Sequence, residues 1–195
     1  MAMNLAQIAG AVGLELINRL FNGATLTLYS GTQPATPETA LSANTALVSF
    51  AFSNPPFGEP TYGSSKMTAT ATFVAASVNP SNSGTTTFGR VTLAASAWVS
   101  THAYTYGTIV SNSGNFYLCV GTGTSAASGG PTATTEAIVD NTVTWNYIGA
   151  TTGQGNVLGD YTCGTSGTDI ILGTTTITIG TNCDITSFTQ SIPVV

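Results

Sequence analysis

Threonine or serine alternates with apolar residues in several runs of this 195-residue chain. In a β-strand successive side chains point to opposite faces, so such a run buries one face and presents hydroxyl groups on the other. Turn-forming residues separate the runs, among them Ser30-Gly31 and Asn54-Pro55-Pro56. We therefore predict an all-β fold, an antiparallel β-sandwich or barrel. The clearest alternating runs are residues 25–29, 68–73, 176–179 and 187–192.

The N-terminal segment follows a different period. Between residues 4 and 21, apolar side chains recur at steps of three and four, which predicts an amphipathic helix that ends at Asn22-Gly23. Residues 1–22 are therefore predicted to form a helical arm. Its apolar stripe either anchors the arm to its own sheet or contacts a neighbouring subunit or capsid surface. The stripe consists of Leu5, Ile8, Val12, Leu16 and Leu20.

Composition changes near residue 94. Residues 94–150 contain both tryptophans, the single histidine and a stretch rich in Gly, Ser, Thr and Ala. Short strands are predicted within this segment at residues 108–110, 116–120 and 142–148. We interpret residues 94–150 as a small inserted β module. The insert interrupts a β-sandwich domain that comprises residues 23–93 and 151–195.

Charged side chains are scarce. They make up 6% of the chain, with three basic and eight acidic residues and a net charge of −5, against about 25% charged residues in typical globular domains. Nucleic-acid binding requires clustered cations, so it is excluded as a function, and anionic membranes are disfavoured. No apolar stretch is long enough to span a bilayer. Contacts with partners are expected to depend on shape, apolar area and backbone hydrogen bonds.

The sequence contains Cys119, Cys163 and Cys183, an odd number without the spacing of a zinc site. Cys163 and Cys183 flank a potential hairpin and would form a disulfide if oxidised. The alternative is that all three are small apolar core residues.

Residue types suited to catalysis are dispersed. His102 is the only histidine, and Glu136 and Asp140 lie in a Thr-rich, turn-like segment where we interpret them as solvated carboxylates. Glycine-rich stretches precede no predicted helix, which argues against phosphate binding, and the acids are too dispersed for a calcium site. We predict no catalytic residues, no cofactor and no metal.

Two segments that flank the predicted insert resemble small virion proteins of tailed bacteriophages. Residues 26–58 read LTLYSGTQPATPETALSANTALVSFAFSNPPFG, and residues 165–172 read TSGTDIIL. The resemblance implies a capsid decoration, or cement, protein on the exterior of the phage head. No signal peptide is evident in the sequence, which leads us to expect synthesis in the host cytoplasm. The partners of such a decoration protein would be the major capsid protein and copies of itself, with a trimer favoured. The alternative within this class is a tail or fibre component for host adsorption.

The insert resembles small chitin- and cellulose-binding modules. The resemblance rests on Trp98, Tyr104-Thr105-Tyr106-Gly107, residues 114–119 (GNFYLC) and Trp145-Asn146-Tyr147. It implies an outward-facing module in which the rings of Trp98, Tyr104 and Trp145 stack on sugars of surface glycans. The alternative is that these rings form the core, because so small a module buries little else. A free carbohydrate-binding protein is the alternative from another functional class.

Overall fold

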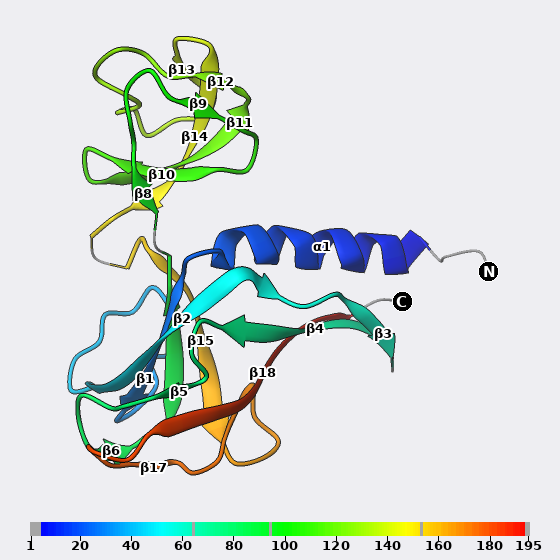
Figure 1. The fold of residues 1–195 in the computed structure, drawn as a ribbon, viewed down its shortest axis with the longest axis vertical. Helices are drawn as coiled ribbons and strands as arrows, with labels where there is room; N and C mark the ends of the chain where they lie inside the picture. The colour runs from blue at the N-terminus through cyan, green and yellow to red at the C-terminus, as the bar shows by residue number, and fades with distance from the viewer. Residues whose placement is uncertain (1–4, 64, 94, 153, 194–195) are drawn as a thin grey trace. The chain divides into compact units, whose positions relative to one another are not determined.

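The computed structural model describes residues 5–63, 65–93, 95–152 and 154–193, with the side chains of residues 5–8 excepted. The chain divides into two compact units (Figure 1). One comprises Met1–Leu93 and Val157–Val195, and the other is Ala94–Asn156. The second unit is therefore an insertion in the sequence of the first.

The first unit contains a helix and eleven of the described strands. They are α1 (Leu5–Phe21), β1 (Thr25–Ser30), β2 (Thr45–Phe57), β3 (Thr61–Gly63), β4 (Lys66–Phe73), β5 (Ser77–Val78), β6 (Gly84–Thr85), β7 (Phe88–Thr92), β15 (Val157–Gly164), β16 (Ile170–Leu172), β17 (Thr176–Ile177) and β18 (Cys183–Pro193).

Seven of these strands close into a barrel. They are hydrogen-bonded in the order β4-β2-β1-β7-β15-β16-β18, and pairing of β18 with β4 completes the ring. All of these pairings are antiparallel except that of β15 with β16. Closure pairs both edges of each barrel strand, which removes the free edges that an open sheet would present. The prediction of an all-β fold with an N-terminal helix is confirmed, with a barrel as the architecture.

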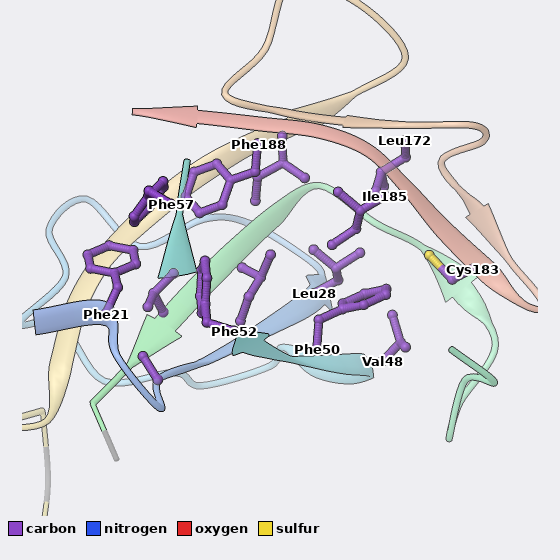
Figure 2. Close-up of a cluster of buried hydrophobic side chains, with 14 of the residues drawn as sticks. Phe21, Leu28, Val48, Phe50, Phe52, Phe57, Leu172, Cys183, Ile185 and Phe188 are labelled. Atoms are coloured by element: carbon purple, nitrogen blue, oxygen red, sulfur yellow. The ribbon is translucent and has the colours of Figure 1, made fainter. Parts of the chain in front are cut away.

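Alternation along the strands fills the barrel interior. Leu26 and Leu28 of β1 are fully buried, whereas Thr25 and Thr27, which alternate with them, face the other side of the sheet. Gly89 lies opposite Leu28, and a Cβ atom at Gly89 would lie only 2.6 Å from Cδ1 of Ile170. The missing side chain therefore makes room for the larger residues around it. Figure 2 shows the phenylalanine-rich core that results.

Helix α1 packs against the barrel through one face. Leu14 and Phe21 are buried, and the Phe21 ring meets those of Phe52 and Phe57 edge-on, with centroids 5.3 Å apart in both cases (Figure 2). The Oδ1 atom of Asn18 accepts a hydrogen bond of 3.1 Å from the backbone N–H of Phe57. The C-terminal end of α1 is thus fixed to β2.

The predicted turn at Asn54-Pro55-Pro56 is wrong. These residues lie within β2, which continues to Phe57, and the pairing of β2 with β4 shifts register between Phe52 and Phe57. Proline has no backbone N–H to donate to a ladder, so two consecutive prolines interrupt the pairing without ending the extended segment.

The second unit is a small β module. Its strands are β8 (Ser96–Ala97), β9 (Ala103–Tyr104), β10 (Ile109–Asn112), β11 (Asn115–Gly121), β12 (Gly123–Thr124), β13 (Ile138–Asp140) and β14 (Val143–Ala150). Five form a sheet in the order β13-β14-β11-β10-β8, and β9 pairs with β12. The three strands predicted from sequence in this segment correspond to β10, β11 and β14. Their inward side chains, with Tyr104, form a core separate from that of the barrel.

Candidate functional site

An apolar surface lies on the side of α1 that faces away from the barrel. Val12 is 57% exposed and Leu16 is 56% exposed, and their spacing of four residues places them one helical turn apart on the same side. Ala9 is exposed one turn before Val12. We refer to Ala9, Val12 and Leu16 as the outer helix face.

The structure separates the members of the stripe that was predicted either to anchor the arm to its own sheet or to contact a neighbouring surface. Leu20 is half-buried and packs against the barrel core, whereas Val12 and Leu16 point away from it. Leu5 and Ile8 lie outside the residues whose side chains are described. The anchoring side of the helix is formed by Leu20 together with Leu14, Ile17 and Phe21, and the predicted stripe omitted these last three.

The charges beside the outer helix face balance one another. Glu15 and Arg19 form an ion pair of 3.2 Å across one helical turn, and both side chains remain substantially exposed. An exposed pair of this kind contributes only about 0–1 kcal/mol to stability. Its consequence for recognition is larger, because the outer helix face has no net charge in its immediate surroundings on the helix. It is suited to a partner that offers complementary apolar area.

In the second unit, the two tryptophans predicted to stack on sugars meet at a buried carboxylate. Asp140 is 6% exposed. Its Oδ2 atom accepts hydrogen bonds from the indole N–H groups of Trp98 (2.8 Å) and Trp145 (3.1 Å), and Oδ1 accepts one from the backbone N–H of Ala126 (2.8 Å). The interpretation of Asp140 as a solvated carboxylate is therefore wrong, whereas its sequence neighbour Glu136 is exposed.

The aromatic rings of this unit form its core. Trp145 is completely buried, and its ring meets that of the buried Tyr104 edge-on with centroids 4.9 Å apart. Trp98 is half-buried and packs against the same cluster. Trp145 thus has no exposed ring face for a sugar, and Tyr104 has almost none. Their placement corresponds to the core alternative, in which a small module depends on its largest side chains for burial.

A second buried carboxylate lies in the first unit, on the barrel wall. Asp160 on β15 is directly opposite Arg90 on β7. The guanidinium donates two hydrogen bonds, Nε to Oδ1 at 2.6 Å and Nη2 to Oδ2 at 2.7 Å, and Nη2 also donates to the carbonyl oxygen of Thr39. Both side chains are at most 3% exposed. No sequence pattern had singled out this pair.

Cys119, Cys163 and Cys183 are free thiols in the structure, so the predicted disulfide between Cys163 and Cys183 is not formed. Cys163 on β15 and Cys183 on β18 lie on strands that are separated by β16 in the sheet, and the two thiols are near enough to interact electrostatically. Burial raises the pKa of Cys163 to about 12 and that of Cys183 to about 11.

Within the described residues, no group of three or more His, Cys, Asp or Glu side chains is arranged to hold a metal ion. No described helix has the length and apolarity needed to cross a membrane. Comparison with protein-family models, with curated proteins and with solved structures finds no match for the chain. Function is therefore inferred from geometry and from the sequence itself.

Proposed function

We propose that this chain is a non-catalytic structural protein of a bacteriophage particle, a decoration protein that binds the assembled capsid lattice. The observation that carries the proposal is the outer helix face, where Val12 and Leu16 are each more than half exposed although the opposite side of α1 packs against the barrel. The sequence resemblance to tailed-phage virion proteins suggests that the partner is the phage capsid.

Binding would act on the shell by mass action. Removing the side chains of Val12 and Leu16 from water favours association by about 25 cal/mol for each Å² of apolar surface buried. A protein that binds the assembled shell and not its separated subunits stabilises the shell by that binding free energy. The partners in this proposal are the major capsid protein and further copies of the chain, with a trimer around a local symmetry axis as the favoured arrangement.

The distribution of charge supports contacts that do not depend on ion pairs. Only 6% of the residues are charged. Two of the three basic residues already form ion pairs within the chain, Arg90 with Asp160 and Arg19 with Glu15. Charged residues are depleted at the centre of protein interfaces, where an unpaired charge is costly to bury.

The proposal is tested on phage particles made with and without this protein. Particles that contain it are expected to retain their genome to a higher temperature, and a label fused to the chain is expected to appear on the head in electron micrographs. A label confined to the tail would contradict the decoration role and favour a tail or fibre component. Equal heat resistance of the two particle types would contradict a cementing role.

A further inference from the structure

A pocket lies within the second unit, between the segment that follows β8 and the strand β10. Its volume is about 350 Å³, which falls within the range of about 300–1,000 Å³ usual for small-molecule sites. The pocket is lined by Ser96, Ala97, Val99, His102, Ala103, Tyr104, Thr105, Thr108, Ile109 and Val110.

Hydrogen bonds fix the wall that carries His102. The hydroxyl of the buried Ser125 donates to the carbonyl oxygen of Val99 at 2.8 Å and accepts from the backbone N–H of His102 at 2.9 Å. The backbone N–H of Ser125 donates to the carbonyl oxygen of His102, and the Tyr104 hydroxyl accepts from the N–H of Val99 at 2.8 Å. A wall held in this way is already formed before a ligand arrives, which reduces the entropic cost of binding.

The imidazole of His102 is oriented by a ring contact. Its ring meets that of Tyr104 edge-on, with centroids 4.7 Å apart, and Tyr104 in turn packs on Trp145. His102 is exposed, and its hydrogen bonds to the other described residues involve only its backbone. The imidazole of His102 thus belongs to an exposed side chain that lines the pocket, and its nitrogens can both donate and accept hydrogen bonds.

The lining defines the chemistry of that ligand. It includes no Asp, Glu, Lys or Arg, so a charged ligand would lose hydration without gaining a counter-charge. One part of the wall is apolar, with Val99, Ile109 and Val110, and the hydroxyls of Thr105 and Thr108 lie beside it, 3.4 Å from each other. The pocket therefore combines apolar contact with groups that both donate and accept hydrogen bonds.

We propose that this pocket binds a small, uncharged ligand whose ring carries hydroxyl groups, a chemistry shared by neutral sugars and nucleosides. The apolar wall contacts the C–H groups of the ring, and His102 and Thr108 form hydrogen bonds with its hydroxyls. This site is distinct from the buried tryptophans, and it does not depend on the outer helix face.

The test is a titration of the ¹⁵N-labelled full-length protein, followed by amide NMR. The probes are methyl β-glucopyranoside, methyl α-mannopyranoside and uridine, with glucuronate and glucosamine as charged counterparts. At least one neutral probe is expected to shift the amide resonances of residues 96–110. The charged probes are expected to bind at least about 10-fold more weakly, because no Asp, Glu, Lys or Arg side chain lines the pocket. The two methyl glycosides and uridine distinguish a sugar from a nucleoside as the source of the ligand.

Two variants remove hydrogen bonds and preserve shape. His102→Phe keeps a ring against Tyr104 but removes the ring nitrogens, and Thr108→Val replaces one hydroxyl by a methyl group. Each is expected to weaken binding by roughly 3- to 10-fold, the effect of losing one hydrogen bond. Thr134→Val is the matched control, since Thr134 is exposed in the same unit and does not line the pocket; it should bind as the wild type does.

Three results would overturn the proposal: no shift at residues 96–110 with any neutral probe, equal binding of the charged probes, or wild-type affinity in both His102→Phe and Thr108→Val. The Val12→Ser/Leu16→Ser variant separates this site from the proposed function. It is expected to bind the small ligand normally, so failure of particle attachment and failure of ligand binding are distinguishable.

Discussion

The two units of the chain each bury one aspartate, and they stabilise it differently. In the barrel unit, Asp160 is paired with a guanidinium that donates two hydrogen bonds to it. In the inserted unit, Asp140 receives three hydrogen bonds from neutral N–H groups, two of them from tryptophan side chains. The chain has only three basic residues. One of them, Arg90, pairs with the buried aspartate of the barrel, whereas the buried aspartate of the insert has only neutral hydrogen-bond donors.

The difference shows how the size of a unit determines what its buried charge can do. The barrel has a large apolar core of its own, and its ion pair joins β7, β15 and the segment that contains Thr39. The insert has a much smaller core, and Asp140 accepts hydrogen bonds from both of its indole N–H groups. We expect loss of Arg90, the charge partner of Asp160, to lower the stability of the barrel strongly. Loss of the Asp140 carboxylate, the hydrogen-bond acceptor of both indoles, is expected to destabilise the core of the insert.

The largest effect is expected from Arg90→Met. The substitution leaves Asp160 buried without its partner, which costs about 3–5 kcal/mol in comparable pairs. Hydrogen exchange of barrel amides against urea measures the loss. The double variant Arg90→Met/Asp160→Leu should recover most of it, because it removes both charges. A single variant as stable as the wild type would show that the pair is not a determinant of barrel stability.

Asp140→Asn is expected to cost less, about 1–3 kcal/mol. One oxygen can still accept from the indoles, but an amide N–H₂ then faces the backbone N–H of Ala126, where an acceptor is needed. Both tryptophans lie in the inserted unit, so their fluorescence reports the unfolding of that unit alone. Glu136→Gln, at an exposed position nearby, is the control and should change the free energy of unfolding by less than about 0.5 kcal/mol. Equal midpoints for the two variants would contradict the role assigned to Asp140.

Alkaline pH should affect the barrel through three buried acids. Burial raises the pKa of Tyr161 to about 12 from an ordinary value of 10.0, and the thiols of Cys163 and Cys183 are raised from 9.0 to about 12 and about 11. These groups bind protons more tightly in the folded state, so their contribution is complete below pH 9 and is lost as the pH rises toward 12. Thermal unfolding of the barrel between pH 8 and pH 10 tests this. A barrel midpoint independent of pH in that range would contradict it.

The smallest effect on stability is expected at the outer helix face. Val12→Ser and Leu16→Ser should each change the free energy of unfolding by less than about 0.5 kcal/mol, since neither side chain is buried. Leu14→Ala, on the opposite side of the same helix, should cost about 2–4 kcal/mol because it leaves a cavity. Urea unfolding of the three variants compares the two sides. A large loss in either serine variant would show that the outer face belongs to the core.

Much of the fold could be predicted because it follows from local patterns. The alternation predicted at residues 25–29 forms strand β1, with Leu26 and Leu28 inside the barrel, and within the described residues the predicted helix coincides with α1. The side of the helix that packs could not be predicted in this way. Apolar residues surround most of α1, so Val12 and Leu16 fit a helical stripe as well as Leu14 and Phe21 do.

The buried charges depended on tertiary structure that no local pattern records. Arg90 and Asp160 are 70 residues apart and meet only because β15 pairs with β7 across the insert. Asp140 lies in a Thr-rich segment typical of a solvated turn, but β13 places it against two indoles. Burial of the tryptophans could be anticipated from the sequence, because so small an insert depends on its largest side chains to form a core.

Particle attachment of the Val12→Ser/Leu16→Ser double variant tests the central claim most directly. The measurement is cosedimentation of purified protein with phage heads that lack it, with Val139→Ser as the matched control because Val139 is 73% exposed in the other unit. We predict that the double variant binds at least about 10-fold more weakly than the wild type, since two apolar side chains are lost from the contact, and that the control binds normally. Equal attachment of all three proteins would contradict the assignment of the outer helix face as the binding surface.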